Sequence, residues 1–509
     1  MQSWQIQKHE VRSNGGIVVA QHREAAAAGA AVLAKGGTSM DAAIVTALVL
    51  SVVEPWLSGI GGGGFLLHAD PASGTVDALD FNVMSPAGVA QKDYPPAPGK
   101  DGDWFDWPSV VEDKNLIGYS SICIPGAIAG FAEALARHGS ISWAEALAPA
   151  IAFAERGLEV DWYASLSIAI DGAGLARYPA SSAIFLEDGR APRTAEKGNS
   201  IFRPMPKKAA LLRRLAESGA RDFYEGAVAR TLVGDLQAGG STISLDDLAA
   251  YKPVWCKPLE GSFAGKRIQV MPGLSGGPAL LDCLARLGDL PADPHSGAMA
   301  LKFAQGIRGA YEYRLTKVGH AGTTDPGCTS HISVVDSAGR MVSLTNTLLS
   351  RFGSKVVLPE AGILMNNGMM WFDPRPGQPN SIKGRVKPLA NMCPVIVQEA
   401  DGTPSLAIGA AGGRQIFPAI AQLLTYHLHY GLSLEQAFHT PRIDASTPVI
   451  RINRAAASDV ASKVASEFAV ELIDDTLYPV NFAVPSAVTA ASGMAHPTNP
   501  WAAAVSSDG

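Results

Sequence analysis

Residues 326–350 read PGCTSHISVVDSAGRMVSLTNTLLS, and this stretch has the pattern of a β-hairpin. Residues from His331 to Val335 alternate in the way typical of a strand, residues 337–340 supply a turn, and Met341 to Leu348 form a second strand-like run. The hairpin therefore carries a threonine, Thr329, at its head.

A threonine in this place can act as a nucleophile if the peptide bond before it is cut. The freed α-amine of Thr329 then lies beside its own hydroxyl and can act as the base. We therefore take the bond between Cys328 and Thr329 as a candidate cleavage site and Thr329 as the candidate nucleophile. The alternative is one more strand rich in threonine and serine, and the hairpin alone does not decide between the two.

Short motifs occur on both sides of the hairpin. Those before it are Gly36–Ala43, Val52–Pro55, Ser58–Phe65, Ala78–Phe81, Pro125–Gly126, Ala129–Phe131, Trp143, Leu147–Ile151 and Gly157; those after it are Phe352–Ser354, Gly362–Asn367, Lys387–Leu389, Gly412–Gly413 and Pro441–Arg442. In this order, from about Gly15 to about Arg442, the chain resembles the gamma-glutamyltranspeptidase family of N-terminal-nucleophile hydrolases. One such motif is a weak signal, whereas so many in order are a strong one.

The resemblance implies an α+β fold with four αββα layers, in which two stacked sheets lie between helices. It also implies one body made of two subunits cut from one precursor. These are a large subunit of residues 1–328 and a small catalytic subunit of residues 329–509 that starts at Thr329. A homodimer of such heterodimers stays open, and no metal or organic cofactor is expected.

Catalytic support is implied for three further residues. Thr347 matches the family threonine whose hydroxyl supports the nucleophile, although an ordinary strand threonine is the alternative. Gly412 and Gly413 match a pair whose backbone N–H groups face the developing oxyanion, where losing one donor typically costs about 10²–10³ in rate. His331 shares a strand face with Thr329, but the family does not use it as a base, so we expect a structural histidine.

The glycine-rich run Ser58–Gly64 invites comparison with a phosphate-binding loop. No Lys-Ser/Thr pair follows it, and it leads into the strand-like Phe65–His68, where a phosphate-binding loop would open a helix. We expect these glycines to permit close backbone approach, with substrate contact as the alternative.

Substrate recognition is where the sequence departs from the family. Transpeptidases hold the γ-glutamyl group by an arginine on its α-carboxylate and an acid on its α-amine, and these positions fall on Asn82 and Trp371. The paired serines of the family are here Ala390 and Asn391, and its asparagine after the supporting threonine is Leu349. Because removing one partner of a buried ionic contact costs roughly 2–5 kcal/mol, we expect a different acyl group.

The identity of that acyl group stays open. Trp371, Phe372 and a loop between Tyr94 and Asn115 that holds Trp104 and Trp107 favour a pocket with apolar walls, as in cephalosporin-acylase-like members; the loop itself is expected to be a lid. Arg351, Lys387 and Arg414 could instead bind one carboxylate, as in oxamate amidohydrolases, or could simply be solvated. The substrate-binding candidates are Asn82, Arg351, Asn367, Trp371, Asn391 and Arg414.

Local signals also place several helices. Capping boxes are formed by Thr38 with Asp41, by Ser142 with Glu145 and by Ser433 with Gln436. A further helix is expected from about Gln415 to Tyr430.

Composition sets outer bounds on the function. The 509 residues are 47% apolar with a net charge of −6, which favours a folded enzyme and disfavours a nucleic-acid partner. The first 19 residues lack the apolar core of a secretory signal, and Ile44–Val53 is shorter than the roughly 20 residues that cross a bilayer. The five cysteines show no ligand spacing, so we expect a reduced, cytoplasmic protein without zinc and without membrane contact.

These patterns together predict an autoprocessing amidohydrolase or acyltransferase that cleaves a small-molecule amide through a threonyl acyl-enzyme. The first alternative is a gamma-glutamyltransferase or glutathione hydrolase. The second is a homologue that has lost catalysis and serves as a binding protein, against which the retention of Thr329, Thr347 and Gly412–Gly413 argues.

Overall fold

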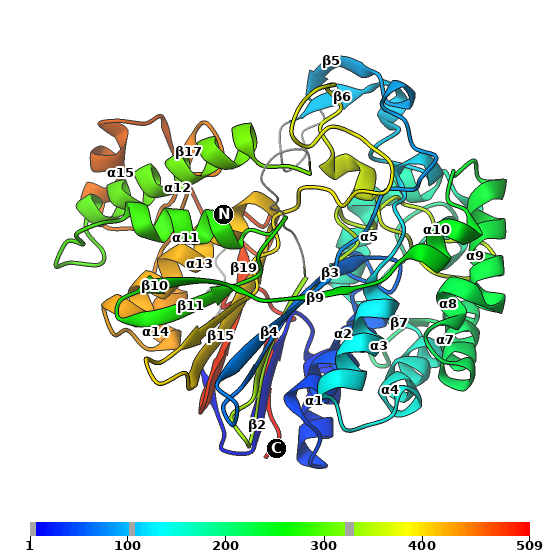
Figure 1. Cartoon of the computed structure of the whole chain (residues 1–509), viewed down its shortest axis with the longest axis horizontal. Coiled ribbons are helices and arrows are strands. Elements are labelled where there is room, and N and C mark those ends of the chain that lie inside the picture. The colour runs from blue at the N-terminus through cyan, green and yellow to red at the C-terminus, as the bar shows by residue number, and fades with distance from the viewer. Residues whose placement is uncertain (1–6, 101–106, 321–329, 509) are drawn as a thin grey trace.

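Two seven-stranded antiparallel sheets stack at the centre of the computed structural model, which describes residues 7–100, 107–320 and 330–508 (Figure 1). Sheet I consists, in spatial order, of β1 (Val11–Arg12), β20 (Ser492–Ala495), β19 (Val484–Thr489), β15 (Pro404–Ala411), β14 (Val395–Gln398), β11 (Lys266–Val270) and β10 (Leu259–Phe263). Sheet II consists of β21 (Ala503–Ser506), β2 (Gly16–Ala20), β12 (Ser330–Asp336), β13 (Met341–Thr347), β3 (Gly63–Asp70), β4 (Thr75–Phe81) and β9 (Val254–Cys256).

Helices cover the outer face of each sheet. Sheet II contacts α1 (Arg23–Ala34), α2 (Ser39–Val53) and α3 (Ala127–His138), and α4 (Trp143–Arg156) packs outside α2. Sheet I contacts α11 (Gly277–Arg286) and α13 (Ile416–Leu424), and α12 (Gly297–Lys317) packs against both helices. The predicted αββα architecture is therefore confirmed.

The remaining elements surround this sandwich. They are the helices α5 (Trp162–Leu175), α6 (Pro179–Phe185), α7 (Pro206–Ser218), α8 (Asp222–Glu225), α9 (Ala227–Ala238), α10 (Leu245–Ala250), α14 (Leu434–His439) and α15 (Ser458–Ala465), and the short strands β5 (Pro96–Lys100), β6 (Pro108–Val110), β7 (Leu158–Glu159), β8 (Phe202–Arg203), β16 (Ile443–Asp444), β17 (Ile450–Asn453) and β18 (Val470–Ile473). Across the described ranges, every helix is too short or too polar to span a bilayer.

Strands β12 and β13 form the predicted hairpin in the middle of sheet II. Ser330 pairs with Asn346 and Val335 with Met341, so the register runs the length of both strands. Ile332 and Val334 belong to the apolar core that β12 shares with the covering helices. Of the alternate positions, His331 and Ser333 carry polar side chains that face sheet I.

A buried polar layer joins the hairpin to sheet I. The His331 ring lies 3.1 Å from Thr345 Oγ1 and 3.0 Å from Ser333 Oγ. Ser333 Oγ donates to the Ser486 carbonyl of β19 at 3.2 Å, and Ser343 Oγ donates to the Ile408 carbonyl of β15 at 3.1 Å. These contacts agree with the structural role expected for His331.

Two glycine positions show how closely the backbones approach. A Cβ at Gly409 would lie 2.3 Å from the His331 ring, so the imidazole packs directly on strand β15. In the glycine-rich run, a Cβ at Gly62 would lie 1.9 Å from the Thr347 carbonyl oxygen. The run continues into strand β3, and its expected role in close backbone approach is confirmed.

The predicted helix starts are also found. Thr38, Ser142 and Ser433 each form a capping box with the expected partner at the start of α2, α4 and α14. The helix expected from about residue 415 begins as α13 and ends in a π-helical turn at Thr425–His429.

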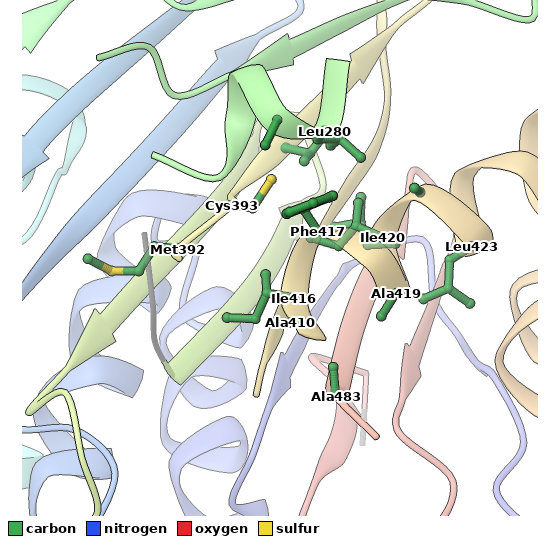
Figure 2. Packing of buried hydrophobic residues seen from close by; sticks show 14 of the residues in the cluster. Leu280, Met392, Cys393, Ala410, Ile416, Phe417, Ala419, Ile420, Leu423 and Ala483 are labelled. Carbon is green, nitrogen blue, oxygen red and sulfur yellow. The ribbon is translucent and has the colours of Figure 1, made fainter. Parts of the chain in front are cut away.

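Helix α13 is fixed to sheet I by apolar packing. Figure 2 shows Phe417 and Ile420 of α13 beside Leu280 of α11, with Ala410 and Ile416 on either side of the turn that joins β15 to α13. Both of these last residues are buried. The turn at 412–415 is therefore held at both ends.

Burial of His331 predicts a pH-dependent stability. Burial lowers its pKa from 6.5 to about 3. As pH falls below 6.5, His331 takes up a proton in the unfolded chain but not in the folded chain. The free energy of unfolding therefore falls by about 1.4 kcal/mol per pH unit between pH 6.5 and pH 3. The midpoint of thermal unfolding should therefore drop less between pH 7 and pH 5 in His331→Gln than in the wild type.

The exposed His9 supplies the matched control, because it pairs with Glu435 at the surface. His9→Gln should keep the pH dependence of the wild type. Equal shifts in all three proteins would contradict the assignment of this acid sensitivity to His331.

Candidate active site

A cavity of about 270 Å³ opens where the hairpin ends beside the turn after β15. Thr347, Arg351, Gly412 and Gly413 all line this cavity, so four of the predicted site residues come together. The full lining is Gln21, Trp56, Leu57, Tyr163, Ser167, Thr347, Leu349, Arg351, Ala411, Gly412, Gly413, Gln415, Tyr478, Pro479, Val480, Val484 and Asn499.

Thr347 is the last residue of β13 and directly follows Asn346, the partner of Ser330. Its Oγ1 accepts a hydrogen bond from the Leu349 N–H at 2.8 Å. Leu349 has a φ of +84°, a conformation that non-glycine residues rarely adopt. The hydroxyl of Thr347 thus stabilises a strained turn at the cavity wall. Thr329 and Cys328 lie outside the described residues.

The Gly412–Gly413 turn needs glycine for two reasons. Both residues have positive φ angles, +136° and +59°, which glycine adopts without steric cost. A Cβ at Gly412 would also lie 2.8 Å from the Ala483 Cα. The carbonyl of Ala483 accepts a hydrogen bond at 3.0 Å from the buried Arg442. This bond holds Ala483 in place against Gly412.

The three cationic candidates for carboxylate binding occupy different places. Arg351 lines the cavity. Lys387 lies 2.8 Å from Asp80 outside the lining, and the Arg414 guanidinium stacks 5.0 Å from the centre of the Tyr311 ring. Only Arg351 of these three is therefore placed at the cavity.

The other substrate-binding candidates do not line this cavity. Asn82 and Trp371 are fully buried, and the Nδ2 groups of Asn82 and Asn391 find no hydrogen-bond partner among the described residues. Asn367 donates to Ser350 Oγ at 2.7 Å and accepts from the Ser350 N–H at 3.1 Å, so it anchors the loop that carries Arg351. A role in substrate binding for these four residues stays a prediction.

The aromatic wall comes from residues that the sequence did not single out. Trp56 lies between two of the quoted motifs, whereas Tyr163 on α5 and Tyr478 near the C-terminus belong to none. The lining contains neither Trp371 nor Phe372. It also contains no residue from 94–100 or 107–115, so the described part of the expected lid does not reach the cavity; Trp104 lies outside the described residues.

A buried acidic group lies close in sequence to this wall. Glu54 is the C-cap residue of α2, two residues before Trp56, and burial raises its pKa well above the usual value. Burial also raises the pKa of Tyr163.

Comparison with known proteins decides the family. A family model described as gamma-glutamyltranspeptidase matches residues 25–320 and 297–475. The Acylase ACY 1 proenzyme of Pseudomonas sp. (strain SE83) is 30% identical over 494 residues, which cover 89% of this chain and 87% of that protein. The chain belongs to the gamma-glutamyltranspeptidase family.

One further relative agrees with this membership, and one solved structure shows a shared fold. The glutathione hydrolase proenzyme of Escherichia coli (strain K12) is 29% identical over 85% of this chain and 81% of its own length. The crystal structure of a cephalosporin acylase from Bacillus halodurans matches with a TM-score of 0.83 at 23% identity, covering 99% of this chain and 98% of that one. As a gamma-glutamyltranspeptidase family member, the chain is an enzyme of the N-terminal-nucleophile hydrolase type.

The hydroxyl of Thr347 should matter more than its shape. Thr347→Val keeps the branched side chain but loses the acceptor for the Leu349 N–H, which should loosen the cavity wall and slow both self-cleavage and amide hydrolysis by about 10- to 100-fold. Fragment formation on a denaturing gel and kcat/KM measure the two steps. Thr347→Ser keeps the hydroxyl and is the matched control. If the valine variant is as fast as the serine variant in both steps, Thr347 is an ordinary strand residue.

Proposed function

We propose that this protein is a self-processing amidohydrolase that cleaves a small acyl amide through an ester on Thr329. The observation that carries the proposal is the meeting of Thr347 and Gly412–Gly413 at one cavity. Ser330, the residue bonded to Thr329, starts β12 and pairs with the neighbour of Thr347. A nucleophile before Ser330 needs both a supporting hydroxyl and oxyanion donors, and both residue sets lie at this end of the hairpin.

Maturation would begin at the Cys328–Thr329 bond. The Thr329 hydroxyl attacks the Cys328 carbonyl carbon, the C–N bond breaks, and the acyl group moves from nitrogen to oxygen. This shift frees the Thr329 amine, which takes up the proton of the hydroxyl. Water then hydrolyses the ester, which leaves the Cys328 carboxylate and regenerates the Thr329 hydroxyl. The products are residues 1–328 and residues 329–509, which stay together as one enzyme.

Turnover would use the same hydroxyl. The free α-amine takes the hydroxyl proton while the Thr329 oxygen attacks the substrate amide carbon. The backbone N–H groups of Gly412 and Gly413 stabilise the negative charge on the carbonyl oxygen, and the protonated amine returns its proton to the leaving nitrogen. Water, or a second amine, then releases the acyl group.

Processing gives the first test. The wild-type protein should show two fragments whose masses match residues 1–328 and 329–509, and Thr329→Ala should remain one chain because it has no hydroxyl to attack. Thr329→Ser keeps a hydroxyl and should still be cut. A small fragment that begins at another residue would assign the nucleophile elsewhere.

Specificity is proposed to differ from that of transpeptidases. The positions of the γ-glutamyl clamp hold Asn82 and Trp371, so neither charge needed for a zwitterionic glutamyl head is present there. The acylase named above is among the relatives, and its name supports an acyl amide as substrate. The second candidate, hydrolysis of glutathione, is favoured by the relative from Escherichia coli.

Purified enzyme should separate the two candidates. Activity on an acyl p-nitroanilide without an α-amino group should exceed activity on γ-glutamyl-p-nitroanilide, because the α-amine would be desolvated without a partner. Release of p-nitroaniline measures both rates. Hydrolysis of glutathione with a kcat/KM of about 10⁴ M⁻¹s⁻¹ or more would instead establish the second candidate.

A further inference from the structure

Two side-chain amides line the cavity, and each is held in one orientation. Gln415 lies two residues after Gly413, and Asn499 lies four residues before β21. A side-chain amide has an NH₂ end that donates hydrogen bonds and an oxygen that accepts them. The protein partners of these two amides therefore determine which end is left for a ligand in the cavity.

The amide of Gln415 leaves its oxygen available. Its Nε2 donates to Asp444 Oδ2 and to the Asn481 carbonyl, each at 2.9 Å. A carbonyl can only accept, so the end of the amide that meets Asn481 must be the NH₂ end. Both N–H bonds are thus used, and none of the described residues donates to Oε1. Gln415 offers a hydrogen-bond acceptor to the cavity.

The amide of Asn499 leaves the opposite end available. Its Oδ1 accepts hydrogen bonds from the backbone N–H groups of Trp501 at 3.0 Å and Ala502 at 3.2 Å. A backbone N–H can only donate, so the end that meets these two groups must be the oxygen. Within the described part of the chain, Nδ2 donates to no acceptor. Asn499 offers a hydrogen-bond donor to the cavity.

The remainder of the wall favours a neutral ligand. Arg351 is the only charged residue in the described lining, and its Nε lies 2.7 Å from Asp171 Oδ2. Trp56 and Leu349 contribute apolar surface. A ligand that fills such a cavity removes water from both amides, and a polar group that loses water without gaining a partner is destabilised. The wall therefore suits a neutral group that carries both a C=O and an N–H.

We propose that the cavity binds a substrate whose acyl group carries a second, uncleaved carboxamide, with Asn499 Nδ2 donating to its C=O and Gln415 Oε1 accepting from its N–H. The inference rests on the proposed amidohydrolase function and names its substrate class: a diamide, of which one amide is cleaved and the other is recognised. A carboxylate has no donor for Gln415, and a hydrocarbon has no partner for either residue. Gln415 and Asn499 are then specificity-determining residues.

Three acyl p-nitroanilides that differ only at the far end test this proposal on the wild-type enzyme. They end in a primary carboxamide, a methyl ketone or an isopropyl group, which have nearly the same shape, and each is made with spacers of increasing length. At the best spacer length, the carboxamide should have a kcat/KM at least about tenfold above that of the isopropyl compound, mainly through a lower KM. The ketone keeps only the C=O contact and should lie between them.

The contrary result is equally plain. If all three compounds are cleaved and the carboxamide has no advantage at any spacer length, the inference is overturned and the proposed function stands.

Asn499→Asp tests the donor. Aspartate keeps the oxygen that accepts from the Trp501 and Ala502 N–H groups, but it replaces the NH₂ by a second acceptor. The ketone should therefore lose its advantage over the isopropyl compound, because its carbonyl then faces an acceptor. A ketone that keeps its advantage would overturn the role of Asn499.

Asn453 supplies the matched control. Its Oδ1 accepts from the Ala455 N–H at 3.0 Å in a turn of the same kind on the surface, away from the cavity lining. Asn453→Asp makes the same chemical change and should keep the wild-type ratios of all three compounds.

Gln415→Met tests the acceptor, since methionine has a similar length but no carbonyl oxygen. The carboxamide should fall to the level of the ketone, while the ratio of ketone to isopropyl compound stays as in the wild type. An equal loss for all three compounds would mean that Gln415 only supports the glycine turn, and would overturn its role in recognition.

Binding of the product acids gives a readout without turnover. The three acids share the carboxylate that hydrolysis creates, so calorimetry on the purified wild-type protein isolates the effect of the far end. The acid with the carboxamide should bind at least about tenfold more tightly than the acid with the isopropyl group. If no anilide is cleaved but this difference in binding is found, the proposed function fails and the carboxamide site is supported. Equal binding of the three acids would overturn the site.

Discussion

A buried polar layer between the two sheets fixes the candidate active site. His331, Ser333 and Ser343 on the hairpin contact the backbone of β15 and β19, and the His331 ring packs on Gly409. Three residues beyond Gly409, β15 ends at the Gly412 turn. These buried hydrogen bonds join the hairpin that ends at Thr347 to the strand that leads into the glycine turn.

This layer explains why the site can tolerate strain nearby. Residues placed by paired strands are positioned more accurately than residues on free loops. The loop after Thr347 departs from common backbone conformations at Leu349, Phe352 and Lys355, yet it begins on β13 and is tied back by Asn367 and Ser181. The sheets therefore hold the loop in place, and the loop places Leu349 and Arg351 in the cavity wall.

The sequence alone predicts those parts whose signals are local. The hairpin depends on alternation over a few residues, and a capping box depends on two residues three positions apart, so both were found. The Gly412–Gly413 turn could be predicted because the motif and its flanking strand and helix are contiguous. Which of Arg351, Lys387 and Arg414 reaches the cavity could not, because Asp171 pairs with Arg351 from a helix 180 positions earlier in the chain.

The aromatic residues of the cavity wall could not be predicted from the sequence either. Trp371 and Phe372 were expected there, but both are fully buried in the core, while Trp56, Tyr163 and Tyr478 come to the cavity from three distant segments. Side-chain type predicts that an aromatic residue will be buried. It does not say against which neighbour, since that is set by how the helices pack on the sheets.

Both sheets interlace strands from the two ends of the chain. In sheet II, Ser333 of β12 pairs with Val19 of β2 on one side, and β13 pairs with β3 on the other. In sheet I, β14 pairs with β11, which precedes the β12–β13 hairpin in the chain. Contacts between such distant positions carry a large entropy cost, because a long loop must be closed to form them, and folds rich in such contacts fold slowly. Neither the chain before the hairpin nor the chain from the hairpin onward holds a complete sheet on its own. The uncut polypeptide is therefore the unit that must reach the native topology, and any later cleavage acts on an assembly that its own strands already keep together.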